Sequence, residues 1–330
     1  MENNLSTEEE TAILMTPASP ELLAKPKFKA YVTGLCMFVA IVLFLGFNFD
    51  TSADSWDKYS RWGHPMLTQI YDGAYWGLIS SNFLHTALWH IGFNLYWIWI
   101  FGRKIEEIEG SWFIGMLVLG ASLMSSMAEI TFSNQMGIGL SGIGYALFGY
   151  GFIKQKSDTR YEAFLDKSNT NMFLVWLFAC IVLTKLNVLN VGNAAHFGGF
   201  ALGVLIGFLS NKGKVVQIAA ATLLIAFVGS GVFWSPYSIS WFEHKAYQNH
   251  SANNISLAIE NYKEVLKREP QNTWAQSNLA IIQYNRLALE GDSLMALQQY
   301  EAAQRCYLEM TKLDSTYHIT HKEIGSNQNP

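Results

Sequence analysis

The sequence predicts an all-α polytopic membrane protein: a bundle of seven membrane-spanning helices followed by a small helical tail outside the bilayer. Half of the 330 residues are hydrophobic, and they are concentrated between Ala30 and Trp234. The segments before and after this block are polar and carry mixed charge. The formal net charge of −4 gives no reason to expect a nucleic-acid partner. These observations make the lipid bilayer the expected surroundings of the central block.

Apolar runs in the central block are long enough to cross the hydrocarbon core, which takes about 20 helical residues. The seven runs are Ala30–Phe49, Leu84–Phe101, Trp112–Ile130, Gly137–Ile153, Asn171–Leu186, Asn193–Leu209 and Val215–Trp234. The loops between them are too short to cover so much apolar surface in water. We therefore expect a six-helix membrane core over residues 30–210 and an additional seventh span over residues 211–234.

Residues 1–29 are expected to form a flexible cytoplasmic segment. They lack the apolar core and cleavage site of a removable signal peptide, so the first apolar run is expected to be retained as a membrane span. The three cysteines, Cys36, Cys180 and Cys306, lie far apart and lack the spacing of metal ligands. We expect neither a disulfide framework, nor a metal, nor a cofactor.

Lysine and arginine residues predict the orientation, because they are retained in cytoplasmic loops. If the runs alternate in direction, eleven basic residues fall on one side of the membrane: Lys25, Lys27, Lys29, Arg103, Lys104, Lys154, Lys156, Arg160, Lys167, Lys212 and Lys214. The other side receives Lys58, Arg61 and Lys185. The amino terminus is therefore predicted to be cytoplasmic and the carboxy-terminal tail extracytoplasmic.

Polar side chains inside apolar runs are candidates for function, because they are costly in lipid without a partner or water. His90 and Asn94 lie four residues apart on one face of the second run. Ser141 and Tyr145 lie near the start of the fourth run, and His196 lies near the start of the sixth. All three runs begin on, or enter from, the outer side, so these groups are expected to meet at one depth.

Small residues are expected to let the helices that carry these groups approach closely. The sixth run contains Gly199 and Gly203 at a spacing of four, and the fourth run contains Gly142 one position after Ser141. Gly139 is assigned to the same helix packing. A serine and a histidine on separate helices must come within about 3 Å for one to deprotonate the other.

The segments around these residues resemble those of the rhomboid family of intramembrane proteases. The resemblance rests on Gly139-Leu140-Ser141-Gly142, on the segment from Ala195-His196 to Gly203, and on His85 with His90-Ile-Gly-Phe-Asn94. Glu106 followed by Gly110-Ser111 also resembles the family, and the likeness extends from about Tyr71 to Leu209. One departure is Gly77, which follows Trp76 where many relatives carry an arginine.

The resemblance implies an intramembrane serine endopeptidase that acts on transmembrane or juxtamembrane segments of membrane proteins. It implies that Ser141 is the nucleophile, that His196 is its base, and that Tyr145 packs against the imidazole. It also implies that His90, Asn94 and the Ser141 backbone N–H hold the oxyanion. A bacterial plasma membrane is the expected location. Glu129, the one acid inside a run, is not expected to reach His196, and His85 and Glu106 are expected to be structural.

The tail, residues 235–324, resembles two degenerate tetratricopeptide repeats. One repeat rests on Ala258, Tyr262, Val265 and Pro270, and the other rests on Leu279, Ala280, Ala303, Tyr307 and Met310, with an insertion around Gly291-Asp292. Two functions stay open for the tail: a solvated appendage without a ligand, or a binding surface for a protein partner. Residues 325–330 are expected to be disordered.

Two other functions compete with a protease for the whole chain. A catalytically silent relative could bind membrane proteins as an adaptor, but such relatives usually lose the serine or the histidine, and this chain keeps Ser141 and His196. A transporter is disfavoured because the runs lack paired charges and broken helices in symmetric halves.

Overall fold

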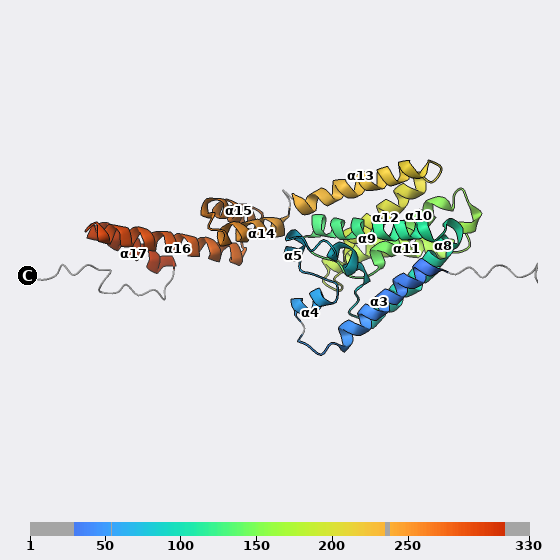
Figure 1. Cartoon of the computed structure of the whole chain (residues 1–330), viewed down its shortest axis with the longest axis horizontal. Coiled ribbons are helices and arrows are strands. Elements are labelled where there is room, and N and C mark those ends of the chain that lie inside the picture. Colours follow the sequence, from blue (N-terminus) through green and yellow to red (C-terminus); the bar gives the residue numbers. More distant parts are fainter. Residues whose placement is uncertain (1–29, 54, 235–237, 314–330) are drawn as a thin grey trace, which may run out of the picture.

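The structure is a computed structural model that describes residues 30–53, 55–234 and 238–313. All regular secondary structure among the described residues is helical, and it forms a membrane-type bundle and an elongated tail that leaves the bundle beside α13 and α5 (Figure 1). The predicted flexible segment 1–29 and the predicted disordered end 325–330 lie outside the described residues. The bundle helices are α3 (Tyr31–Phe49), α7 (Leu88–Trp97), α8 (Arg103–Glu109), α9 (Ser111–Ser133), α10 (Ser141–Lys154), α11 (Lys167–Lys185), α12 (Asn193–Phe208) and α13 (Lys214–Phe233).

The centre of the bundle is α10, in which every residue from Gly142 to Gly151 is buried. It packs mainly against α12 and α9. The outer helices α3, α11 and α13 instead expose large apolar side chains, such as Phe38, Val175 and Phe227. Contact with lipid tails requires an apolar outer surface. The outer helices therefore face the lipid bilayer, as the composition predicts.

The helix lengths correct two of the predicted runs. Among the described residues, four helices are long and apolar enough to span a bilayer alone: α3, α9, α11 and α13. The second run begins at Leu88 rather than Leu84 and continues without a break through the π-helix η2 (Ile98–Gly102) and α8 to Glu109. The fourth run loses its first residues, because Gly139 adopts a φ of 100° that ends any helix before Ser141.

Glu106 joins the beginnings of two helices at the end of the bundle opposite Ser141. Its buried carboxylate accepts hydrogen bonds from the backbone N–H groups of Val32 and Thr33, both at 2.9 Å. It also accepts from the Thr33 hydroxyl at 2.7 Å and from the Ser111 hydroxyl at 2.6 Å. A carboxylate at helix N-termini satisfies free N–H groups and complements the helix dipole. Glu106 is therefore a structural residue that ties α3 to α9.

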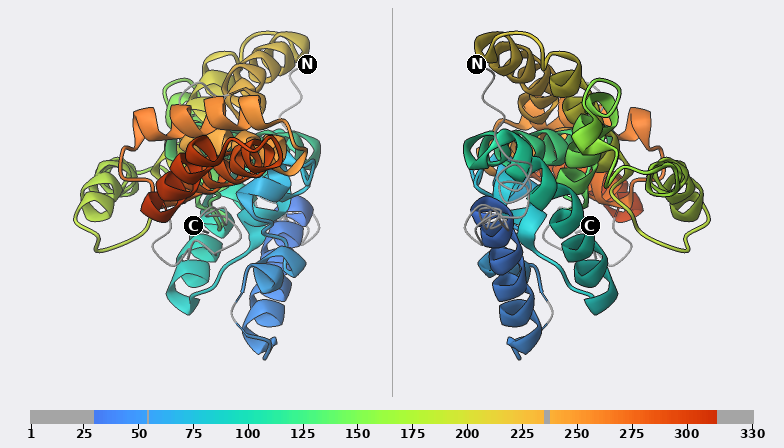
Figure 2. Two further views of the ribbon diagram at one scale, coloured as in Figure 1. Left: turned by 90° about the vertical axis from the view of Figure 1, so that its left-hand side faces the viewer. Right: turned by 90° about the vertical axis from the view of Figure 1, so that its right-hand side faces the viewer.

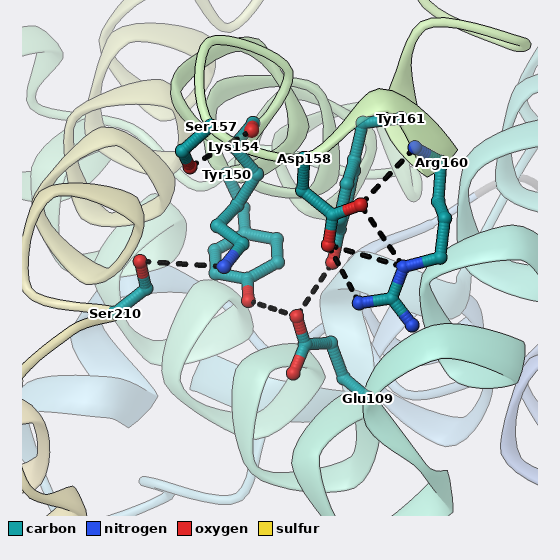
Figure 3. A network of polar contacts seen from close by, with 8 residues as sticks. All are labelled: Glu109, Tyr150, Lys154, Ser157, Asp158, Arg160, Tyr161 and Ser210. Atoms are coloured by element: carbon teal, nitrogen blue, oxygen red, sulfur yellow. Dashed lines mark hydrogen bonds and ion pairs between the residues drawn. The ribbon is translucent and has the colours of Figure 1, made fainter.

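A polar network anchors the carboxy-terminal end of α10, away from Ser141 (Figure 3). Glu109 accepts hydrogen bonds from the hydroxyls of Tyr150 at 2.7 Å and Tyr161 at 2.6 Å. Lys154 Nζ reaches Ser210 Oγ at 3.5 Å. These contacts connect α10 to α8, to η3 (Thr159–Tyr161) and to the end of α12, so the last turn of α10 is fixed in the bundle.

The long loop between α3 and α7 folds into short helices: α4 (Trp56–Arg61), α5 (Leu67–Tyr71), α6 (Gly77–Ser80) and η1 (Ser81–Phe83). Trp62 holds this loop to the end of α3, where its ring fills the space beside Gly46 and its Nε1 donates to Asp50 at 2.9 Å. Gly77 is buried, and a Cβ there would overlap Pro65 and lie 2.8 Å from Ile70. A larger residue at position 77 has no room, and the loop is anchored by Trp62 instead.

The tail consists of two helical hairpins. The first pairs α14 (Ile239–Ser251) with α15 (Ile255–Arg268), and the second pairs α16 (Thr273–Ala296) with α17 (Tyr300–Leu313), which run side by side at the far end (Figures 1 and 2). Ala258, Tyr262 and Val265 are buried in the first hairpin, and Ala303, Tyr307 and Met310 in the second. The predicted insertion at Gly291 is a helical extension of α16 that packs on Tyr307. The membership of these hairpins in a repeat family stays a prediction.

The tail contacts the membrane bundle through α14. Gln248 Nε2 donates to Asp72 Oδ1 at 2.9 Å, and His244 Nε2 lies 3.2 Å from the same oxygen. The His244 ring also packs on Tyr71, with ring centroids 5.2 Å apart. Ser240 Oγ donates to the carbonyl oxygen of Asn134 at 3.3 Å. The first tail helix therefore rests on the α5 loop and on the end of α9.

Candidate active site

Ser141 and His196 lie side by side at the same end of the bundle. Ser141 is the first residue of α10, and His196 lies in the first turn of α12, 55 positions later. His196 Nε2 is 2.8 Å from Ser141 Oγ. This distance is short enough for a hydrogen bond between the hydroxyl and the imidazole, and hence for proton transfer between them.

Glycines bring the two helices together. A Cβ on Gly199 would overlap the carbonyl oxygen of Gly142, and a Cβ on Gly203 would overlap the carbonyl oxygen of Ala146. Gly142 also faces the Ser125 side chain of α9. Backbone-to-backbone contact of this kind is open only to residues without a side chain. The spacing of Ser141 and His196 follows from this crossing.

Gly139 does not lie at a helix crossing, and its assignment to helix packing was wrong. It precedes α10 in a turn with a φ of 100°, a conformation that favours glycine. A Cβ there would lie 2.6 Å from Cε1 of His90. Gly139 therefore lets the chain pass close to His90 immediately before Ser141.

Tyr145 packs its ring against the imidazole of His196, with centroids 4.7 Å apart and planes inclined by 37°. The Tyr145 hydroxyl lies 3.4 Å from the carbonyl oxygen of Phe173, a long hydrogen bond. His196 is 5% exposed, and within the described chain its Nδ1 has no hydrogen-bond partner. Ring packing is therefore the contact that orients the imidazole.

His85 organises the polar groups beside Ser141. Its Nδ1 lies 3.1 Å from the carbonyl oxygen of Phe83, so Nδ1 carries the proton and Nε2 is an acceptor. Nε2 then accepts from the backbone N–H of Leu140 at 3.3 Å and from Nδ2 of Asn94 at 3.1 Å. His85 is completely buried. Its contacts are structural, and they hold Asn94 and the residue before Ser141 in fixed positions.

Backbone N–H groups at the start of α10 complete the polar arrangement. The first N–H groups of a helix have no partner inside the helix. The first helical hydrogen bond of α10 runs from the Gly144 N–H to the carbonyl oxygen of Leu140. The Ser141 N–H comes before this bond and has no helical partner. The Ser141 N–H therefore lies at the positively polarised end of α10, and the His90 and Asn94 side chains line the same cavity as Ser141.

These groups open into one cavity of about 520 Å³. Ser141, His196, His90, Asn94 and Tyr145 all contribute to its walls. The rest of the lining is largely aromatic, from α7 and α11: Trp89, Phe93, Trp97, Phe173 and Trp176. These aromatic residues are not among those that the sequence predicted for the site. The spacing of four between Trp89, Phe93 and Trp97, beside His90, was the signal available for them.

Glu129 does not reach the His196 imidazole, as the sequence predicts, but it binds the residue before His196. Its Oε2 accepts a hydrogen bond from the backbone N–H of Ala195 at 2.9 Å. Ala195 directly precedes His196 in the first turn of α12. Glu129 therefore does not contact the imidazole, but it binds the turn that carries it.

The fold and this site define a class of protein: a polytopic α-helical membrane protein with a paired serine and histidine at the ends of two closely packed helices. The Rhomboid domain family matches residues 72–213. The rhomboid protease GlpG of Haemophilus influenzae is 32% identical over 192 residues, which are 58% of this chain and 94% of that protein. The chain belongs to the rhomboid family and is an integral, multi-pass membrane protein.

Two further relatives are similar over a shorter stretch of the chain. The rhomboid protease GlpG of Serratia proteamaculans is 33% identical over 137 residues, 42% of this chain and 49% of that protein. The corresponding protein of Klebsiella pneumoniae is 32% identical over 134 residues, 41% of this chain and 48% of that protein. The chain spans about half the length of these two relatives. The family match ends at residue 213, before α13 and the tail.

Proposed function

We propose that this chain is an intramembrane serine endopeptidase that cleaves transmembrane or juxtamembrane segments of other membrane proteins. The observation that carries the proposal is the 2.8 Å separation of Ser141 Oγ and His196 Nε2 inside a partly polar cavity of a membrane bundle. Membership of a family whose relatives are named rhomboid proteases supports the same reaction class.

In the proposed reaction, Ser141 Oγ attacks the carbonyl carbon of the scissile peptide bond while His196 Nε2 takes the hydroxyl proton. The carbonyl oxygen becomes an oxyanion, and the Ser141 N–H, Asn94 Nδ2 and His90 stabilise it by hydrogen bonding. His196 then protonates the leaving amine, and the acyl chain remains on Ser141. A water molecule, deprotonated by His196, attacks this ester and releases the second product.

The proposed dyad works without a carboxylate on the histidine. Tyr145 supplies the orientation that a hydrogen-bonded acid would otherwise give, because its ring lies 4.7 Å from the imidazole ring. His85 holds Asn94 by one N–H of its amide at 3.1 Å, which leaves the second N–H for the oxyanion. Preorganised donors of this kind lower the activation barrier because they need no rearrangement during the reaction.

The short length of α10 supports a site below the membrane surface. The helix has 14 residues and is therefore about 21 Å long. If Lys154 lies at one membrane boundary, Ser141 lies roughly 9 Å inside the other boundary of a hydrocarbon core about 30 Å thick. A transmembrane substrate would unwind near its end to present an extended peptide bond to Ser141, since helical peptide groups are shielded by their own hydrogen bonds.

The proposed orientation places the amino terminus in the cytoplasm of a bacterial cell and Ser141, His196 and the tail on the outer side. The distribution of lysine and arginine in the loops supports this orientation. Protease added to intact spheroplasts should digest the tail and spare the bundle. Complete protection of the tail would place it, and the proposed site, on the cytoplasmic side. In the outer location the tail would be free to bind a protein partner.

The direct test is labelling of the full chain in membranes with a fluorophosphonate probe, together with cleavage of a reporter transmembrane segment. Ser141→Ala should abolish labelling and lower cleavage by at least roughly 10³-fold. Ser122→Ala is the matched control, because Ser122 lies in α9 and its hydroxyl only donates to Val118 at 2.8 Å. Continued cleavage by purified Ser141→Ala protein would refute the proposal. Absence of both labelling and cleavage in the unmodified chain would favour the silent-adaptor alternative.

A further inference from the structure

We infer that Glu129 is a positioning residue of the proposed dyad, which joins the loop leading to Ser141 with the helix that carries His196. The inference rests on the proposed function and adds a residue to its machinery. Glu129 lies near the end of α9, is the one charged residue of that helix, and is 1% exposed. A carboxylate at such a site needs hydrogen bonds, and both of its oxygens have them.

The first contact of Glu129 is with α12. Oε2 accepts from the Ala195 N–H at 2.9 Å, and Ala195 is the third residue of that helix. The N–H groups of a first helical turn have no partner within the helix, so an acceptor from another element fixes the position of the turn. His196 is in this turn, and its N–H bonds to the Gly192 carbonyl oxygen at 3.1 Å. A displaced turn would move the imidazole relative to Ser141.

The second contact of Glu129 is with the loop that leads to Ser141. Oε1 accepts from Gln135 Nε2 at 3.0 Å. Gln135 directly follows Asn134, which ends α9 in the left-handed conformation with a φ of 55°. The loop from Gln135 to Leu140 carries the turn at Gly139 and delivers Ser141 to the start of α10. One carboxylate thus binds both the loop before Ser141 and the helical turn that carries His196, whose relative position sets the geometry of the dyad.

Two glycines lie beside the Glu129 carboxylate. A Cβ on Gly192 would lie 3.3 Å from Oε2 of Glu129, and a Cβ on Gly137 would lie 3.6 Å from its Cγ. Gly137 belongs to the Ser141 loop, and Gly192 immediately precedes α12. The backbone of both segments therefore lies against the Glu129 side chain, most closely at Gly192.

Hydrogen-bond acceptance is the property that the geometry uses. In a Glu129→Gln variant the amide oxygen can still accept from the Ala195 N–H. Its NH₂ group can then donate to Gln135, whose own amide rotates to present oxygen. Glu129→Met has a similar length but no comparable acceptor. The two variants differ in the feature that we propose to be important and little in volume.

The experiment measures the second-order rate of fluorophosphonate labelling of Ser141 and the kcat and KM for a reporter transmembrane segment, with the full chain in liposomes. Glu129→Met should lower the labelling rate and kcat by about 10- to 100-fold, because a shift of about 1 Å in a catalytic group has effects of this size. KM should change by less than about twofold, since the aromatic walls are untouched. Glu129→Gln should recover both rates to within about threefold of the unmodified chain.

A matched control separates positioning from general stability. Glu106→Met removes an equally buried carboxylate that caps helices at the opposite end of the bundle. It should lower the thermal midpoint and leave the labelling rate of the folded protein unchanged. Glu129→Ala, which admits water in place of the side chain, repeats the comparison if the methionine variant does not fold.

Labelling of Glu129→Met and Glu129→Ala within about twofold of the unmodified rate would overturn the inference. An equal loss in Glu129→Gln and Glu129→Met would also overturn it, because charge rather than acceptance would then be needed. Either result leaves the proposed protease function intact as long as the unmodified chain is labelled and Ser141→Ala is not. Failure of the unmodified chain to react would instead remove the proposed function itself.

Discussion

The carbonyl oxygen of Gly142 faces Gly199 across the crossing of α10 and α12, in the space that a Cβ at Gly199 would fill. Gly142 follows Ser141 directly, and Gly199 lies one helical turn after His196. The contact between these two backbones therefore sets the 2.8 Å separation of Ser141 Oγ and His196 Nε2. The proposed chemistry depends on this contact, and several measurable consequences follow from it and from its surroundings.

Gly199→Ala should separate the two helices and impair the site. Overpacking of a tight core costs about 1–3 kcal/mol, and a lateral shift of about 1 Å can lower catalysis by 10²-fold. We expect a lower thermal midpoint and a loss of fluorophosphonate labelling of that order. Gly115→Ala is the control, since a Cβ there meets nothing within 4 Å. Normal labelling of Gly199→Ala would show that the crossing tolerates a methyl group.

Tyr145 should be needed for its ring and not for its hydroxyl. Tyr145→Phe removes one long hydrogen bond of 3.4 Å and keeps the packing on His196, so kcat should stay within about threefold. Tyr145→Ala frees the imidazole and should lower kcat by about 10²-fold. Reporter cleavage by both variants checks the prediction, and equal losses in the two would contradict it.

Asn94 should stabilise the transition state and contribute little to binding of the substrate. Asn94→Ala removes a proposed oxyanion donor and should lower kcat by about 10²- to 10³-fold while KM stays nearly constant. The measurement is steady-state cleavage of the reporter segment at several substrate concentrations. A rise in KM with constant kcat would instead assign Asn94 to substrate binding.

Glu106 should contribute to stability and not to the reaction. Its carboxylate accepts four hydrogen bonds inside the bundle. Glu106→Gln replaces one acceptor oxygen by a donor and should lower the free energy of unfolding by about 3 kcal/mol. Denaturation of the variant and of the unmodified chain at pH 7 measures this difference, and the labelling rate of the folded variant should stay unchanged.

Docking of the tail on the α5 loop should weaken in mild acid. Burial lowers the pKa of His244 below its ordinary value of 6.5, against an opposing effect of the Asp72 carboxylate. The docked ring binds fewer protons than the free ring, so docking is strongest above about pH 6.5 and weakens as the pH falls. Spin labels at Leu257→Cys and Leu186→Cys should report a broader distance distribution at pH 5 than at pH 8.

The control for this measurement is His244→Gln, which removes the imidazole from the interface and keeps Asp72. Its distance distribution should be the same at both pH values. Leu257 and Leu186 are exposed, and the native cysteines Cys36, Cys180 and Cys306 are buried, so labelling should be selective. A pH-independent distribution in the unmodified chain would show that His244 does not govern docking.

Several features of this protein could be predicted from its residues alone. The apolar runs predicted the helical membrane bundle, because hydrocarbon accepts only backbones that satisfy their own hydrogen bonds. Ser141, His90, Asn94 and His196 were singled out because polar groups are rare in such runs. Glu106 was predicted to be structural, and its four hydrogen bonds agree with that prediction.

Other features depended on contacts between distant segments. Hydropathy could not show that α10 begins only at Ser141, since Gly137 and Leu140 are as apolar as the helix that follows; the φ of Gly139 decides that point. The aromatic walls of the cavity come from α7 and α11, which periodicity does not place beside each other. Gly77 is small because Pro65 and Ile70 pack against it, a contact absent from any local pattern.

Glu129 shows most clearly the difference between what the sequence determines and what the tertiary structure decides. The sequence by itself determined that an acid stands near one end of an apolar helix, and that such a group needs partners. Only the tertiary structure decided that these partners are the Ala195 N–H and the Gln135 side chain. Composition and periodicity report how each segment meets its solvent, whereas hydrogen bonds between segments depend on how the helices cross.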